Sequence, residues 1–171
     1  MADKTPSTED VIIDAAYNIR GRILQRSIEI ESLFDLYIAE SITSDENKIS
    51  ELICLILAPR VSFEDKRQIF VYLVDMYNPE FRKNYPDFAK DLQTICKERN
   101  VYAHYPIAFS NDATKCYEDK KVVTFVKLKN SKNQLVDKHE KSESDINDLL
   151  RLMGKYIDAI VKLGDGKQPP L

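Results

Sequence analysis

Three residues near position 100 have types and spacing that could support acid–base chemistry on a phosphate. Arg99, Asn100 and His104 lie at the end of a long helical pattern, just before Tyr105 and Pro106. On a helix that advances about 100° per residue, Asn100 and His104 share a face and Arg99 leaves from the neighbouring flank. An imidazole can accept or deliver a proton near neutral pH, and a guanidinium can hold a phosphate in a fixed orientation. We therefore expect a phosphodiester as the partner of this group.

The stretch from Arg99 to His104 resembles the signature of the HEPN superfamily, written as Arg, a polar residue, three more residues and His. The family places this motif late in a helix of a small helical domain, with a hairpin or loop and a final helix after it. The resemblance implies RNA cleavage without a metal or another cofactor, leaving a cyclic phosphate. It implies that His104 carries protons, that Arg99 holds the phosphate and that Asn100 orients His104 or the phosphate.

The resemblance also implies partners. Family members usually pair two copies across a two-fold axis, so we expect a homodimer whose composite cleft contains both Arg99 and both His104 side chains. Facing arginines would make that cleft an anion site. The resemblance is also compatible with a role as a toxin or defence component that has a protein antitoxin or regulatory partner. Toxins neutralised by a nucleotidyltransferase carry a tyrosine two residues after the motif His, whereas this chain has Pro106 there and Tyr105 adjacent.

Further residues near the motif and on the first helix are candidates for RNA contact. They are Tyr102, Tyr105, Lys97, Arg20, Arg22 and Arg26. An aromatic ring can stack on an unpaired base, a contact worth about 1–3 kcal/mol. Core packing explains Tyr102 equally well, whereas Tyr105 is expected to be exposed. Surface ion pairs, such as Arg26 with Glu29, explain the basic residues at least as well.

Two other interpretations of the motif stay open. A histidine near a helix C-terminus is a common stabilising choice because a cation there meets the negative end of the helix dipole. The chain could also be a non-catalytic HEPN-like binding module or regulator in a protein complex, since a fold does not fix a function. A metal site is not expected, because the chain has only two His, and its three Cys lack C-x-x-C spacing.

Composition is typical of one soluble globular domain. The 171 residues are 43% hydrophobic and 31% charged, and we expect a single domain over residues 1–171 with flexible tails at 1–8 and 165–171. No apolar run approaches the 18 or so residues of a membrane span, and the first ten residues lack the features of a secretory signal, which predicts a cytoplasmic protein. The net charge of -3 disfavours indiscriminate coating of nucleic acid.

Hydrophobic periodicity predicts an all-α fold, an up-and-down bundle of four to five helices with a small β-hairpin inserted before the last helix. Helices are expected from the caps Ser7 and Ser62, over 48–57, from Tyr85-Pro86 to the motif, and from the cap Ser142. The segment 48–57 is apolar on more than one face, which predicts deep burial. Alternation over 121–129, a turn at 130–133 and a short return over 134–138 predict the hairpin, with His139 just beyond it on the surface.

Overall fold

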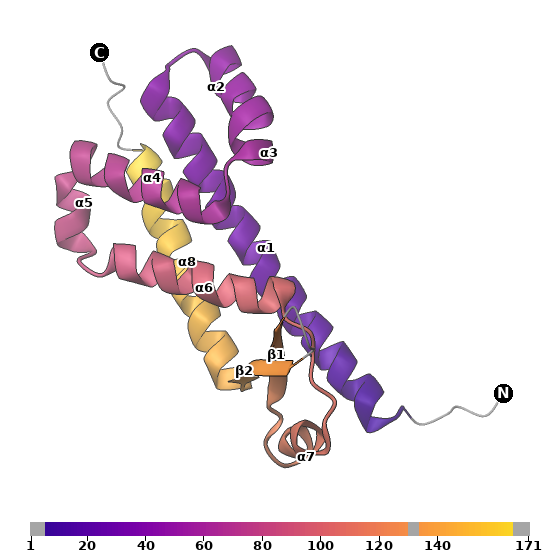
Figure 1. Cartoon of the computed structure of the whole chain (residues 1–171). Helices are drawn as coiled ribbons and strands as arrows, with labels where there is room; N and C mark the ends of the chain where they lie inside the picture. The colour runs from indigo at the N-terminus through magenta and orange to yellow at the C-terminus, as the bar shows by residue number, and fades with distance from the viewer. Residues whose placement is uncertain (1–5, 130–133, 166–171) are drawn as a thin grey trace. The chain divides into compact units, whose positions relative to one another are not determined.

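The chain folds into helices with one two-stranded hairpin before the last helix, as predicted. The computed structural model describes residues 6–129 and 134–165. Its elements in chain order are α1 (Thr8–Ile42), α2 (Glu46–Leu52), the π-helix η1 (Ile53–Leu57), α3 (Ala58–Arg60), α4 (Phe63–Tyr77), α5 (Pro79–Asn84), α6 (Phe88–His104), α7 (Asn111–Lys120), β1 (Val123–Lys129), β2 (Gln134–Lys141) and α8 (Glu143–Asp165) (Figure 1). Since α2, η1 and α3 follow one another without a break, the described residues hold seven helical segments, more than the four to five predicted.

The elements divide between two compact units. The first unit comprises Met1–Gln25 and Glu98–Arg151, and the second comprises Arg26–Lys97 and Leu152–Leu171. The first unit holds the Arg99–His104 motif, α7 and the hairpin, and the second holds α2 to α5. The single domain stays a prediction. Of the expected tails and turn, residues 1–5, 130–133 and 166–171 lie outside the described residues, whereas α1 already begins at Thr8.

Short polar motifs set several helix starts, as predicted. The hydroxyl of Ser7 donates to the carboxylate of Asp10 at 2.7 Å, and the same serine-to-aspartate contact is 2.6 Å both at the start of α4 and at the start of α8. In each case the backbone amide of the aspartate also donates to the serine hydroxyl at 3.2 Å, which satisfies a backbone group that a helix end leaves without a partner. α6 ends at His104, in the motif as predicted, and α4 ends at Tyr77; each end lies shortly before a proline.

Aromatic side chains build the core of the second unit. Phe34 on α1 stacks on Phe70 of α4 with ring centroids 4.6 Å apart, and it contacts Phe63 at 5.9 Å. Tyr37, one turn after Phe34, meets Phe70 edge to face at 5.1 Å, and its hydroxyl accepts a hydrogen bond from Asn78 at 2.6 Å. Stacked and edge-to-face pairs of this kind add to the free energy gained by burying the rings.

The prediction of deep burial for segment 48–57 is wrong. Leu57 is buried, but Leu55 is 63% and Ile56 47% exposed. A short helical segment packs only one of its faces against the rest of its unit. Apolar residues on its other faces therefore stay exposed to solvent. The helical structure also runs past residue 57, because α3 continues to Arg60. Among the described helices, none combines the length and the apolar character that a membrane crossing needs.

A buried cation links α1 and α4 in the second unit. The side chain of Lys66 is 1% exposed, and its Nζ lies 2.8 Å from Glu31 Oε1 and 2.9 Å from Asp35 Oδ2. Asp35 is also buried, and burial raises the pKa of its carboxyl although Lys66 opposes that shift. A buried charge is tolerated only when it is paired, so the two carboxylates make this lysine compatible with the core.

Lys66→Met should therefore lower the free energy of unfolding by about 3–5 kcal/mol, because two carboxylates would keep their charge without a cation. The double variant Lys66→Met/Asp35→Leu should recover part of the loss. Lys83→Met is the matched control: its pair with Glu80 is exposed, and its loss should cost about 0–1 kcal/mol. Urea unfolding of the four proteins measures these differences, and equal midpoints for Lys66→Met and Lys83→Met would contradict the account.

Candidate functional site

The three motif residues share the end of α6 in the first unit. His104 is the last residue of the helix and is exposed, as is Asn100 one turn earlier. Arg99 is half-buried, and its Nη1 donates a hydrogen bond to Asn100 Oδ1 at 3.2 Å. The structure thus leaves the imidazole open to solvent, and on the same helix end the amide of Asn100 helps to orient the guanidinium of Arg99. An imidazole in the last turn is also favourable to the helix itself, so both interpretations of the motif fit this placement.

The backbone that follows His104 is fixed against the hairpin. The carbonyl of Pro106 accepts a hydrogen bond from the amide of Val126 at 2.9 Å, and the amide of Ala108 donates to the carbonyl of Thr124, also at 2.9 Å. Ile107 between them forms an antiparallel bridge with Phe125 of β1. These residues therefore act as a short additional strand beside β1, and the end of α6 is anchored to it.

Arg20 of α1 joins this anchor. Its Nη2 donates to the backbone carbonyl of Tyr105, and its Cζ lies 5.3 Å from the centre of the Phe125 ring. A guanidinium over an aromatic face gains a cation–π attraction, and its planar fork is suited to the carbonyl in the same place. Arg20 was one of several candidates for RNA contact, and in the structure it holds the segment after the motif.

Core packing is the interpretation of Tyr102 that fits the structure. Its side chain is 1% exposed, and its ring meets Phe125 edge to face at 5.2 Å. Burial raises the pKa of its hydroxyl. In this conformation the ring has no open face for a nucleic acid base, so Tyr102 supports the site without forming its surface. Tyr105 is half-buried, and its ring lies 5.2 Å from the imidazole of His139.

The prediction that places His139 just beyond the hairpin is wrong. β2 continues to Lys141, and His139 lies within it, opposite Phe125 in the register. The imidazole is half-buried, and its Nε2 is a buried atom without a hydrogen-bond partner among the described residues. The residues around it, from Asp137 to Lys141, do not alternate between apolar and polar side chains. The sequence pattern therefore does not indicate a strand at His139. The chain's second histidine therefore packs on the tyrosine that follows the first.

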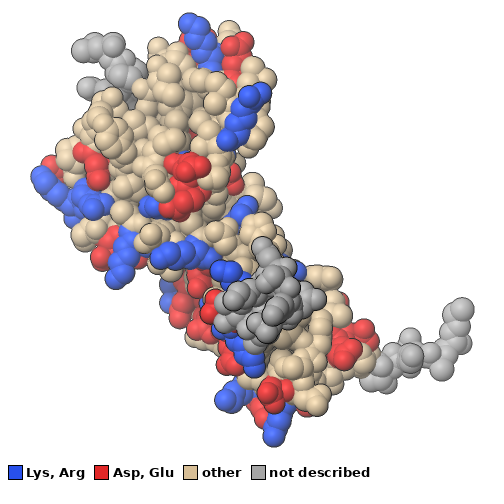
Figure 2. All heavy atoms as spheres, in the orientation of Figure 1, with Lys and Arg blue, Asp and Glu red and all other residues tan. Residues whose placement is uncertain are grey.

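The other basic candidates are less closely tied to the motif. Arg22 donates to Asn147 Oδ1 at 3.2 Å in the first unit. Arg26 pairs with Glu29 at 2.7 Å, as the ion-pair interpretation expected, and Lys97 is exposed; both belong to the second unit. On the face drawn in Figure 2, Lys and Arg are interspersed with Asp and Glu. The candidate site therefore consists of Arg99, Asn100 and His104, together with the residues that hold the end of α6 in place.

Arg20→Lys should loosen the segment after His104, because an ammonium cannot reproduce the planar contact with both the carbonyl and the ring. Losing a hydrogen bond from a charged donor costs about 1.5 kcal/mol or more, so exchange of the Ala108 and Val126 amides should quicken by about tenfold. Arg22→Lys, the same change at an exposed position of the same helix, is the control. Hydrogen exchange followed by NMR makes the measurement, and unchanged protection at both amides would argue against the anchor.

Neither a metal centre nor a known relative identifies the site. Over residues 6–129 and 134–165, no three His, Cys, Asp or Glu side chains gather in a way that could hold a metal ion. Cys54, Cys96 and Cys116, which all lie in the described part of the chain, form no disulfide with one another. No family model, no curated protein and no solved structure matches the chain.

Proposed function

We propose that the chain is a metal-independent endoribonuclease in which His104 moves protons and Arg99 holds the phosphate. The observation that carries the proposal is the exposure of the His104 imidazole at the end of α6, in the same unit as the Arg99–Asn100 pair. A large substrate needs such an open position, and both side chains have chemistry suited to a phosphodiester.

In the proposed reaction, His104 accepts the proton of the ribose 2′-hydroxyl as its oxygen attacks the adjacent phosphorus. The new bond from the 2′-oxygen to phosphorus closes a cyclic phosphate, and the bond from phosphorus to the 5′-oxygen breaks. Arg99 opposes the negative charge that grows on the phosphate oxygens, and Asn100 keeps the guanidinium in position. A protonated imidazole delivers a proton to the departing 5′-oxygen, so that a 5′-hydroxyl is released.

A homodimer would complete this site. A single helix end offers one imidazole, whereas the reaction needs one group to take a proton and another to give one. Two copies related by a two-fold axis would supply both, with the His104 of the partner subunit as the acid. The paired Arg99 side chains would then face a single phosphate and attract it strongly.

Cleavage of RNA in EDTA tests the reaction. His104→Ala should slow cleavage by about 10²–10⁴-fold, because it removes the general acid and base. Arg99→Ala should cost about 10²–10³-fold through lost charge stabilisation. Arg151→Ala is the matched control, since it removes an exposed guanidinium whose ion-pair partner among the described residues is Asp148 on α8.

The product ends give an independent readout, because only the proposed attack leaves a cyclic phosphate beside a 5′-hydroxyl. Wild-type protein that binds RNA without cutting it would favour the binding-module alternative. Cleavage that persists at the wild-type rate in His104→Ala would refute the assignment of that residue.

Mixing tests the composite cleft. If each cleft needs the His104 of both copies, adding an excess of His104→Ala protein to the wild-type protein should lower the cleavage activity, because exchange creates mixed dimers that hold a single imidazole. Sedimentation velocity at micromolar concentration should show a dimer. A monomer under the conditions of cleavage, or a wild-type rate that an excess of His104→Ala protein leaves unchanged, would remove the dimer from the mechanism.

A further inference from the structure

A cavity of about 290 Å³ lies in the first unit, apart from the motif residues. Its floor is apolar: Val123 at the start of β1 is 1% exposed and Ile146 on α8 is 2% exposed. Ile19 of α1 and Tyr117 of α7 form part of its wall. The volume is near the lower end of the usual range of about 300–1,000 Å³ for ligand sites, which suits a small molecule.

Three charged side chains line the cavity from three different elements. Arg22 comes from α1, Lys121 follows α7, and Glu143 is the first residue of α8. All three are exposed, and among the described residues none of them forms an ion pair. An apolar floor below two cations and one carboxylate is complementary to a ligand that carries both signs of charge and an apolar part.

Lys121 has an unusual backbone for its residue type. Its φ of 55° and ψ of 35° are left-handed, and no other non-glycine residue of the described chain has a positive φ. Glycine is the residue favoured where a helix ends this way, because it has no Cβ to clash. The chain instead places a lysine there, with its Nζ 5.1 Å from the centre of the Tyr117 ring on the cavity wall. The left-handed backbone does not favour lysine. We therefore attribute the lysine at this position to the contacts that its side chain makes at the cavity.

We propose that this cavity binds a free α-amino acid with an apolar side chain. The carboxylate would lie between Arg22 and Lys121, the ammonium would contact Glu143, and the side chain would cover Val123 and Ile146. A simple anion fits less well because Glu143 repels it and it would leave the apolar surface of Val123 and Ile146 uncovered. A simple cation meets two like charges on the same rim. The inference is independent of the ribonuclease proposal, since it uses none of the motif residues.

Calorimetric titration of the full chain with L-leucine tests the proposal. Three analogues each remove one recognised group: leucinamide lacks the carboxylate, 4-methylpentanoate lacks the ammonium, and glycine lacks the apolar side chain. Each should bind at least about tenfold more weakly than leucine, the loss expected for one charged hydrogen bond or one buried aliphatic side chain.

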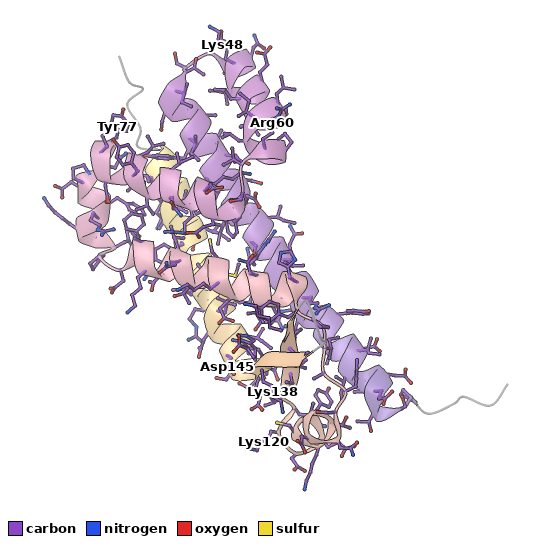
Figure 3. All side chains as sticks on the ribbon, in the orientation of Figure 1. Lys48, Arg60, Tyr77, Lys120, Lys138 and Asp145 are labelled. Carbon is purple, nitrogen blue, oxygen red and sulfur yellow. The ribbon has the colours of Figure 1, made fainter. Side chains whose placement is uncertain are left out.

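Lys121→Gly separates binding from folding. Glycine suits the left-handed backbone, so the melting temperature should be equal or higher, while the affinity for leucine should fall by about tenfold. Glu143→Gln should reduce the preference for leucine over 4-methylpentanoate. Lys120→Gln is the control, since Lys120 is an exposed residue of α7 that does not line the cavity; Figure 3 labels it together with Asp145 in the first turn of α8.

Three results would overturn the proposal. The first is the absence of saturable binding of L-leucine and L-phenylalanine at millimolar concentration. The second is displacement of leucine by inorganic phosphate at equal concentration, or equal binding of 4-methylpentanoate, either of which would indicate a plain anion site. The third is unchanged affinity in Lys121→Gly. Since RNA is absent from these titrations, none of the results bears on the ribonuclease proposal.

Discussion

The candidate site depends on the pairing of residues 106–108 with β1. A helix end normally frays, because its last carbonyls have no partners within the helix. Here the backbone that follows His104 is hydrogen-bonded to the hairpin on both sides of Ile107, and Arg20 holds the carbonyl of Tyr105. The hairpin in turn gains a neighbour, which matters because two strands alone are only marginally stable. The motif and the hairpin therefore support each other within one unit.

Features set by local sequence could be predicted. The serine caps, the prolines that follow helix ends and the alternation of β1 each act within a few residues, and the structure has them where they were expected. Arg99, Asn100 and His104 fall on one helix end for the same reason. Their chemical role stays a prediction, since it depends on a substrate and on a second copy.

Features set by contacts between distant residues could not be predicted. The return strand was predicted over 134–138, but its extension through His139 to Lys141 is polar and forms because β1 lies beside it. α7 lies in a polar segment between Pro106 and the hairpin, and it was not predicted from the sequence. Ser110 nevertheless caps it as the other serines cap their helices. Exposure of Leu55 and Ile56 shows the opposite error: apolar character indicates a preference for burial, but other elements must provide the cover.

The choice of arginine at position 20 has a consequence for how the site responds to acid. A guanidinium keeps its proton throughout the range in which proteins stay folded, whereas an imidazole can gain or lose one within it. The hydrogen bond from Arg20 to the Tyr105 carbonyl therefore comes from a side chain that acts only as a donor. A histidine or a carboxylate in that place could change between donor and acceptor as a proton is gained or lost. With arginine, the hydrogen bond that holds the segment after the motif keeps a single direction.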